Sequence, residues 1–474
     1  MFDAYVTFQA GVRPHAPAIV TPNRIATYGE LEDDVNRMAA GLRRLGVAPD
    51  RGIVSLNLSD PYLKHLAFLA MARLGVASSP AGDPAADLTL TDMQGVAEAG
   101  QIQLSPSWIQ STLQAEPYPV EPVRGPPDTV VRIMLSSGTT RTPRRVAKTW
   151  RSMESSAHTG VMTHLSVKSG RWVAFTGLDT MLGQNMALVA WATGATLVSG
   201  MDIPMLVRDL NALHPSIIGL TPVQLGGLLA TLPERSVFQP QLRLVVSGSV
   251  LPPGLAREAR LRLAPELWMS YGATESGTIA MVDGAMLETH PGVVGFAMPG
   301  VQVDVVDPDG APVPNGTQGE IRVISERIAQ GYIGNPQETA TTFRHGGFYP
   351  GDIGRKLVGG LIVVDGRKDE RMTIDGLKFL PNRVEVLALE VPGVRDAAAF
   401  AVPDGNNIDH CWLAVVQGDG LDRAVLAAKM AEPDHQLPPI NFAWTEDIPR
   451  NERGKIDRNA LRESTLAALG KALK

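Results

Sequence analysis

Residues 133–148 contain side chains well suited to binding a polyphosphate. The apolar residues 133–135 lead into 136–140, a stretch of small residues with free backbone N–H groups and four hydroxyls. Arg141 and Arg144 follow at once. Phosphate oxygens are acceptors that repel one another until cations neutralise them. This stretch predicts a loop that binds a nucleotide triphosphate, and a plain Ser/Thr turn is the alternative.

Two later clusters place acidic and aromatic side chains beside glycines. Residues 271–275 contain Tyr271, whose ring can stack on a base, and Glu275, an oxygen ligand suited to Mg²⁺. Asp352 follows a Pro-Gly turn, where its carboxylate can accept hydrogen bonds from two ribose hydroxyls. The first cluster alone is equally typical of an ordinary turn, and the second alone is more typical of one.

Two further clusters are rich in basic residues. Residues 366–369 read Gly-Arg-Lys-Asp, and residues 449–458 place Lys455 on a loop that contains a glycine. Either cluster alone is typical of a solvated surface. The Walker pattern is absent because Lys455 is followed by Ile456, and GxGxxG is absent as well. A nucleotide loop at 136–144 must then use another scheme.

Composition excludes several classes of function. The chain has 474 residues, with 43 Lys and Arg against 49 Asp and Glu, so it has no basic surplus for sequence-independent nucleic-acid binding. This length predicts two or more domains. A single cysteine, Cys411, cannot form an intramolecular disulfide and fits a reducing cytosol. The first residues do not form a basic segment followed by a long apolar one, and no run approaches the roughly 20 apolar residues of a membrane-spanning helix. We expect a soluble, cytoplasmic protein without a membrane span.

Apolar periodicity predicts alternating strands and helices over about the first 280 residues. Leu31, Val35, Met38 and Leu42 recur at spacings of three and four, which predicts a helix with one apolar face. Strands that alternate with helices indicate a parallel sheet covered by helices, an α/β fold. The other predicted elements are helices 62–74 and 184–192 and strands 18–20, 25–28, 53–58, 172–175, 196–198, 217–220, 244–247 and 267–269.

The pattern changes near Pro291. Alternating valines between 301 and 305, with turns on either side of 311–313, predict a small antiparallel β subdomain. A second break falls at the charged residues 365–370, after which about 105 residues show an α+β pattern. We predict a large N-terminal domain, 1–367, with α/β layers and the β subdomain, and a small α+β C-terminal domain, 368–474.

Taken in this order, the five clusters resemble the adenylate-forming, AMP-binding superfamily of acyl- and aryl-CoA synthetases, peptide-synthetase adenylation domains and luciferases. Residues 136–144 look like its phosphate loop, 271–275 like its adenine and magnesium motif, and 349–352 like its ribose motif. Residues 366–369 match its hinge and 449–455 its catalytic-lysine motif. The connecting motifs at Gly319-Glu320 and Gly331-Tyr332 also fit, so the resemblance covers almost the whole chain.

The resemblance implies an ATP-dependent ligase that acts in two half-reactions. A carboxylate attacks the α-phosphate to give an acyl-adenylate and pyrophosphate, and a thiol of CoA or of a carrier-protein phosphopantetheine then takes the acyl group. Lys455 would stabilise charge on the α-phosphate, while Glu275 and Thr139 would hold Mg²⁺. The C-terminal domain would rotate about Asp369 between the two half-reactions, and Gly376 would meet the thiol arm.

The resemblance also assigns binding residues. The nucleotide would contact Ser136, Ser137, Gly138, Thr139, Thr140, Arg144, Gly248, Ser249, Tyr271, Gly272, Ala273, Thr274, Asp352 and Arg367. The carboxylic acid would contact Gly183, Asn185, Thr221, Ser247, Gly272 and Gly277. These acid-binding residues are small or neutral, which favours an uncharged acyl or aryl acid.

Two residues depart from the family pattern of the phosphate loop. The family usually has Gly at Arg141 and Lys at Arg144. An arginine keeps the charge of lysine but replaces a point ammonium with a planar fork. If the replaced glycine has positive φ, a side chain there costs about 1 kcal/mol or more. The loop is then rearranged or slower, and a catalytically silent nucleotide- or acyl-binding member is one alternative.

The second alternative is an amino-acid adenylation protein. Amino-acid-activating members carry an Asp upstream of a Thr-Gly-Ala segment to bind the α-ammonium. Counting back from 193–195 reaches Met181, and the nearest acid, Asp179, is two residues away. This offset weakens the amino-acid interpretation, although a shifted loop would restore it. The identity of the acid and the choice between CoA and a carrier protein stay open.

Overall fold

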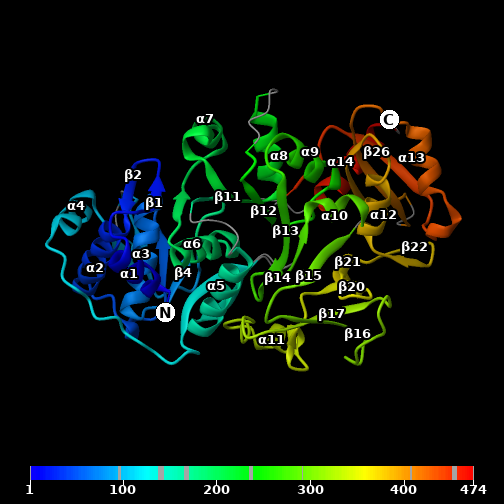
Figure 1. Ribbon diagram of the computed structural model, residues 1–474. Helices are drawn as coiled ribbons and strands as arrows, with labels where there is room; N and C mark the ends of the chain where they lie inside the picture. Colours follow the sequence, from blue (N-terminus) through cyan, green and yellow to red (C-terminus); the bar gives the residue numbers. More distant parts are fainter. Residues whose placement is uncertain are drawn as a thin grey trace.

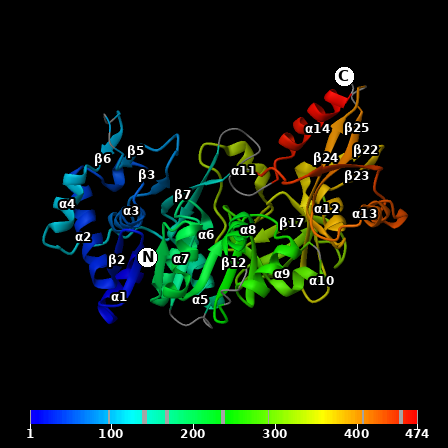
Figure 2. The same ribbon diagram turned by 90° about the horizontal axis from the view of Figure 1, so that it is seen from above.

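The computed structural model describes most of the chain. The described residues are 2–93, 95, 98–136, 143–164, 170–233, 239–290, 292–405, 408–450 and 456–472. Two sheets with helices between them form the N-terminal part, and a smaller α+β unit forms the C-terminal part, drawn in orange and red (Figure 1). Seen from above, this unit lies at the opposite end of the molecule from the first sheet (Figure 2).

The first sheet has the strand order β6-β5-β3-β4-β7-β8. Its pairs are parallel except for the antiparallel hairpin of β7 and β8, which sets Ser136 opposite Arg144. The predicted phosphate loop therefore connects two paired strands. The strands are β3 Val54–Asn57, β4 Ser78–Pro80, β5 Leu88–Thr91, β6 Gln101–Gln103, β7 Val130–Ser136 and β8 Arg144–Thr149.

The second sheet contains 15 strands within the described residues. Its first half, β10, β9, β11, β12 and β13, is parallel, and β1 joins β10 in parallel. These strands are β1 Pro17–Thr21, β2 Arg24–Thr27, β9 Arg171–Ala174, β10 Thr196–Ser199, β11 Pro215–Leu220, β12 Arg243–Ser247 and β13 Glu266–Ala273.

From β13 onward the second sheet is antiparallel, as the valine pattern predicts. The small β subdomain is thus a continuation of the large sheet and is not a separate sheet. Its strands are β14 Gly277–Asp283, β15 Val293–Ala297, β16 Gln302–Val306, β17 Gly319–Ile324, β18 Phe343–Arg344, β19 Gly347–Phe348, β20 Asp352–Lys356 and β21 Ile362–Arg367.

Helices cover both faces of the second sheet. One core joins the two sheets through α2, α3, α5 and α6, and another packs α7 to α10 on the opposite face. The helices are α1 Asp3–Val12, α2 Tyr28–Arg44, α3 Pro61–Leu74, α4 Pro106–Gln114, α5 Trp150–His164, α6 Met181–Thr193, α7 Ile203–Leu213, α8 Pro222–Thr231, α9 Pro253–Arg262, α10 Gly284–Thr289 and α11 Pro336–Thr342, with the short 3₁₀ helix η1 Pro49–Arg51.

Helix α2 shows how the sequence determines these elements. Thr27 and Glu30 form a reciprocal capping box at its first turn. The residues of its predicted apolar face, Leu31, Val35, Met38 and Leu42, are all fully buried. The predicted α/β fold of this half of the chain is confirmed.

The C-terminal unit has two sheets and its own apolar cores. The fully or nearly fully buried residues of these cores lie between Ile374 and Leu461. Its elements are η2 Lys368–Glu370, β22 Met372–Ile374, β23 Leu377–Phe379, α12 Pro381–Leu389, β24 Val394–Pro403, β25 Asp409–Gln417, α13 Arg423–Met430, η3 Pro433–His435, β26 Ile440–Thr445 and α14 Arg458–Ala472. In the described part of the chain, no helix is both long and apolar enough to cross a membrane.

Candidate active site

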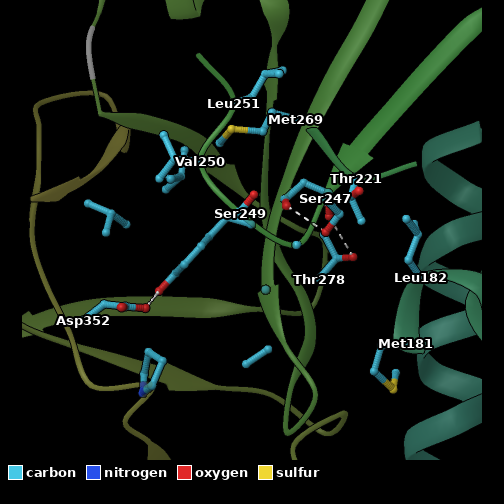
Figure 3. Close-up of a pocket in the computed structure, with 18 of the residues that line it drawn as sticks. Met181, Leu182, Thr221, Ser247, Ser249, Val250, Leu251, Met269, Thr278 and Asp352 are labelled. Carbon is cyan, nitrogen blue, oxygen red and sulfur yellow. Dashed lines mark hydrogen bonds between the residues drawn. The ribbon is translucent and has the colours of Figure 1, made fainter. Parts of the chain in front are cut away.

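A cleft of about 1520 Å³ is lined by both sheets, by α5 and α6, and by residues of the C-terminal unit. In Figure 3, Met181 and Leu182 of α6 lie on the right, Thr221, Ser247 and Ser249 lie toward the centre, and Asp352 lies on the left, away from α6. Most predicted site residues line it: Ser136, Arg144, Asn185, Thr221, Ser247, Gly248, Ser249, Tyr271, Gly272, Ala273, Thr274, Glu275, Gly277, Asp352, Arg367 and Asp369.

Glu275 is held by residues from three distant segments. Its Oε1 accepts hydrogen bonds from Ser136 Oγ at 3.0 Å and from the Tyr332 hydroxyl at 2.8 Å. Its backbone oxygen accepts from Lys148 Nζ at 2.9 Å and from the Ala329 N–H at 2.8 Å. Oε2 has no hydrogen-bond partner among the described residues. A nearly buried carboxylate with one uncommitted oxygen fits Mg²⁺, which takes one or two protein carboxylates together with phosphate oxygens.

The β13–β14 hairpin positions Glu275. The register shifts between Tyr271 and Gly272, and a Cβ on Gly272 would lie 2.3 Å from the carbonyl oxygen of Gly277. Gly277 itself has a φ of +69°, which favours glycine. The two glycines therefore allow a tight turn over residues 274–276 that directs Glu275 toward β7.

The cations near the phosphate loop have specific partners. Arg144 forms an ion pair with Glu338 and lies over the Tyr332 ring, with its Cζ 5.4 Å from the ring centroid. Arg145 forms an ion pair with Asp83 at 2.9 Å. Of the basic residues that follow the loop, Arg144 alone lines the cleft within the described part of the chain.

Lys148 and Arg327 are two buried cations close to Glu275. Burial lowers the pKa of Lys148 to about 8, an effect that nearby Arg327 strengthens and Glu275 opposes. Burial also lowers the pKa of Arg327 to about 10. Arg327 lines the cleft, and its buried NH2 has no partner among the described residues. The cluster thus carries positive charge beside the predicted phosphate loop.

Asp352 and Tyr271 form a second polar group in the cleft. The Tyr271 hydroxyl donates a hydrogen bond to Asp352 Oδ2. In Figure 3 the dashed line at Asp352 marks this bond. Burial and the adjacent carboxylate raise the pKa of Tyr271 well above its ordinary value, so the hydroxyl stays protonated. Arg367 lies 3.4 Å from Asp352 and 3.1 Å from Asp369. A carboxylate next to an aromatic ring is the arrangement predicted for ribose and adenine.

The predicted acid-binding residues divide into two groups. Asn185, Thr221, Ser247, Gly272 and Gly277 line the cleft, and Gly183 does not. A Cβ on Gly183 would lie 1.7 Å from the Thr176 carbonyl oxygen, so this glycine serves the close packing of the first turn of α6.

The predicted thiol-arm residue lies at an exposed turn. Asp375 and Gly376 both have positive φ, 51° and 78°, as a two-residue hairpin between β22 and β23 requires. Gly376 is exposed, and no neighbouring heavy atom lies within 4 Å of the position of a Cβ. It does not line the cleft.

Several predicted residues lie outside the described residues. Lys455, the predicted catalytic lysine, is one of them. The others are Ser137, Gly138, Thr139, Thr140 and Arg141 of the loop between β7 and β8. Their predicted roles stay predictions.

The sequence alone did not assign a role to three residues that surround Glu275. Tyr332 entered only as part of a connecting motif, Lys148 only as the last residue of the stretch 133–148, and Arg327 not at all. The signal for Lys148 was its place in β8, two residues after the fully buried Val146 and therefore on the same face of the strand. No local pattern marks the tyrosine hydroxyl as a partner of Glu275, because 57 residues separate them.

Comparison with known proteins gives a consistent result. The model of the AMP-binding enzyme family matches residues 6–104 and 83–333. Indoleacetate–CoA ligase of Aromatoleum aromaticum is 26% identical over 513 residues, 97% of each chain. The fatty acid–[acyl-carrier-protein] ligase ScoC of Streptomyces coeruleorubidus is 24% identical over 515 residues, 96% of this chain and 95% of that protein.

A third relative is much longer. One of the polypeptides of the linear gramicidin synthase of Brevibacillus parabrevis is 26% identical over 483 residues, which are 94% of this chain but 6% of that protein. Among solved structures, ATP-bound MatB of Rhodopseudomonas palustris superposes with a TM-score of 0.83 at 21% identity, over 98% of each chain. This likeness confirms the predicted fold.

Proposed function

The chain belongs to the AMP-binding enzyme family and is an AMP-forming acid–thiol ligase, and we propose that it activates an uncharged acyl or aryl acid. In the first half-reaction a carboxylate oxygen bonds to the α-phosphorus of ATP, the bond to the β-phosphate bridge breaks, and pyrophosphate leaves. In the second, a thiol sulfur attacks the acyl carbon, the thiol proton passes to solvent, and AMP leaves. One observation supports the adenylation step most directly. Glu275 is held by Ser136 and Tyr332 in the same cleft that contains Tyr271 and Asp352.

The nucleotide would extend between these two polar groups. Asp352 would accept from the ribose hydroxyls while the Tyr271 ring stacks on adenine. Ser136, with the loop residues that follow it, would bind the β- and γ-phosphates. Mg²⁺ bound to Glu275 would supply positive charge next to the leaving pyrophosphate. Lys455 would stabilise the charge that develops on the α-phosphate.

Charge in the cleft favours an acid whose only charged group is its carboxylate over an amino acid, which also carries an ammonium group. Asp179, the carboxylate nearest to the position that binds an α-ammonium, forms ion pairs with Lys64 through Oδ2 at 2.5 Å and with Arg132 through Oδ1 at 3.6 Å, although Oδ1 accepts no hydrogen bond among the described residues. The Arg132 side chain is fully buried and also donates to the Leu178 carbonyl at 3.0 Å, so the loop before α6 is fixed. An ammonium group at Asp179 would compete with two cations.

We further propose that residues 1–367 and 368–474 act as two domains and that the second rotates about Asp369. The end of β21 at Arg367 and the separate apolar cores beyond Ile374 support this division. Rotation would bring the exposed Gly376 turn toward the cleft, where it would meet the thiol arm. CoA and an acyl carrier protein both occur as acceptors in the names of relatives, so both are candidate thiol donors.

Acid-dependent exchange of pyrophosphate into ATP tests the proposal. Purified protein is assayed with panels of fatty, aromatic and amino acids. We expect exchange with at least one uncharged acid, followed by thioester formation when CoA or a loaded carrier protein is added. Exchange with amino acids alone would support the amino-acid alternative, and exchange with no acid would indicate a silent nucleotide-binding member.

A further inference from the structure

The hydroxyls of α5 that face the acid-binding end of the cleft already donate hydrogen bonds. Ser156 and Thr159 donate to carbonyl oxygens one turn earlier, at 2.8 and 2.9 Å. Thr163 donates to the Thr159 oxygen at 3.0 Å. Ser247, at the end of β12, donates to the Ser270 oxygen at 3.0 Å. These donors are used within the protein and do not need a ligand.

Asn185 differs from these hydroxyls because one of its polar atoms has no hydrogen-bond partner among the described residues. It lines the cleft, and its Oδ1 is buried without a hydrogen-bond partner among the described residues. A buried amide oxygen that accepts no hydrogen bond destabilises the folded protein, because its hydration is lost and not replaced. Such a cost is expected where a ligand supplies the missing partner.

The surroundings of Asn185 explain why the protein supplies no partner. On α6 it lies one turn after Met181 and one turn before Val189, so its helix neighbours on this face are apolar. On α5 the facing residue is Gly160, where a Cβ would lie 3.5 Å from Asn185 Nδ2 and 2.5 Å from a Val189 methyl group. The two helices are packed too closely there for another side chain. The amide therefore stands among apolar groups at the edge of the cleft.

Apolar side chains also line the cleft next to the first turn of α6. In Figure 3, Met181 and Leu182 extend from α6 toward Thr221, Ser247 and Thr278. Beyond them the cleft is lined by Trp172, Ile217 and Val245, whose side chains are at least nine-tenths buried. An acid whose carboxylate lies near Ser247 and Gly272 would place the far end of its body between these apolar side chains and Asn185.

We propose that the acid substrate carries a hydrogen-bond donor, an O–H or N–H group, on an otherwise apolar body, and that this group pairs with the Asn185 amide oxygen. The inference rests on the proposed function and names its substrate class. A polar site of this kind rejects analogues that lack the partner group, because the buried amide is then left unpaired. An unsubstituted fatty acid or aryl acid is accordingly a poor substrate.

Matched acids test the inference in the exchange assay. The pairs are phenylacetate with its 2-, 3- and 4-hydroxy derivatives, and 1-methylindole-3-acetate with indole-3-acetate. 4-Methoxyphenylacetate keeps an oxygen but has no donor. For at least one pair we expect the donor-bearing acid to have a kcat/KM about 10- to 100-fold higher, with the methoxy acid behaving like phenylacetate.

Variants identify the residue responsible. Asn185→Leu keeps the branched shape of the side chain, removes the amide and should abolish the preference for donor-bearing acids, while circular dichroism and ATP titration show independently that the variant is folded. Asn185→Ala should do the same with lower activity overall. Thr193→Val removes a polar group from the other end of α6, where Thr193 donates to the Val189 oxygen, and should leave the preference unchanged.

Three results would overturn the inference. They are equal or better activity on every unsubstituted acid, a methoxy acid as good as its hydroxy counterpart, and a preference that persists in Asn185→Leu. If no acid of any class supports exchange, the proposed function fails and the inference fails with it. That outcome is distinct from exchange that simply lacks the predicted preference.

Discussion

Glu275 is the residue at which three parts of the chain meet. Ser136 comes from β7, Tyr332 from the segment before α11, and Lys148 from β8. Hydrogen bonds to a carboxylate fix its direction, so its second oxygen is aimed before any ligand arrives. This preorganisation is the property that a metal-binding carboxylate needs in order to act without rearrangement.

Glu275→Gln tests that role. A glutamine still accepts from Ser136 and Tyr332, so we expect the free energy of unfolding to change by only about 1 kcal/mol. Adenylation should fall by about 10²- to 10³-fold, because a neutral amide is a poor magnesium ligand. The measurement is acid-dependent pyrophosphate exchange across a Mg²⁺ titration. Glu258→Gln makes the same change on α9, where Glu258 pairs with Arg262 and does not line the cleft, and is the matched control. An unaltered Mg²⁺ dependence in Glu275→Gln would remove Glu275 from metal binding.

Lys455→Ala addresses the predicted catalytic lysine. Loss of a cation that stabilises the transition state should reduce adenylation by about 10²- to 10³-fold, with little change in ATP affinity. Exchange kinetics and ATP titration by calorimetry separate the two effects. Lys429→Ala, a C-terminal lysine that pairs with Glu390, should behave like the unchanged protein. A parallel loss of ATP binding in Lys455→Ala would indicate a binding role and argue against the catalytic one.

For single residues, the sequence identifies which side chains belong to the site better than it identifies their hydrogen-bond partners. Glu275 and Asp352 could be named because each belongs to a recognisable cluster that contains a glycine. The hydrogen bond from Tyr332 and the buried guanidinium of Arg327 arise from packing between segments that are far apart in the chain. Burial, the property that makes Arg327 and Asn185 informative, is set by the whole fold and cannot be read from neighbouring residues.

Helices α3 and α6 are joined by a buried histidine. The ring of His65 packs edge-on against Trp191 with centroids 5.9 Å apart, and its Nδ1 lies 2.7 Å from the Pro61 oxygen. Burial lowers the pKa of His65 from its usual 6.5 to about 4. Between these values the unfolded chain binds a proton that the folded chain does not, so acidification favours unfolding.

His65→Leu measures this contribution. From pH 6.5 to pH 4 we expect the free energy of unfolding of the unchanged protein to fall by about 3 kcal/mol relative to the variant. Urea denaturation at several pH values gives the difference, in which other titrating groups cancel. The difference should be constant above pH 7, where His65 is neutral in both states. A difference that stays constant down to pH 4 would mean that His65 has its ordinary pKa.

The β13–β14 hairpin differs from its predicted form. The apolar residues 267–269 predict a strand that ends before Tyr271, whereas β13 continues to Ala273. The strand continues because the register shift at Gly272 allows pairing with β14 to extend to Gly277. In the same way β21 continues through the charged residues 365–367, which hydrophobicity alone marks as the end of a strand.

Gly272→Ala tests the hairpin. The added methyl group would lie 2.3 Å from the Gly277 carbonyl oxygen, so the two strands must separate or the turn must shift. We expect a loss of about 1 to 3 kcal/mol in the free energy of unfolding, together with weaker ATP binding, because Glu275 moves with the turn. Gly226→Ala on α8, where no neighbouring atom lies within 4 Å, is the control. Unchanged stability and ATP affinity would show that the hairpin tolerates the side chain.

Across the whole molecule, the segment after β21 connects the cleft to the C-terminal unit. Arg367 pairs with Asp352 on one side and with Asp369 on the other. Arg458, three residues after Lys455, pairs with Glu370 at 3.3 Å and with Glu385 at 2.9 Å. The segment next to the proposed pivot is thus tied to the first residue of α14. The composition breaks predict a domain boundary after residue 367, because a separate core needs its own apolar segments, and this division stays a prediction. The breaks carry no information on how the two units are joined.

Asp369→Pro separates the two half-reactions. Proline fixes φ near −65° and restricts Lys368, so the rotation that the second half-reaction needs should be blocked. We expect pyrophosphate exchange to stay within about 3-fold of the unchanged protein while thioester formation falls by about 10²-fold or more, since only the second step requires the new domain arrangement. Asp369→Ala removes the ion pair with Arg367 without restricting the backbone, and it should retain both half-reactions. If proline reduces exchange and thioester formation equally, residue 369 is not the pivot. If alanine has the same effect as proline, the ion pair matters more than the rotation.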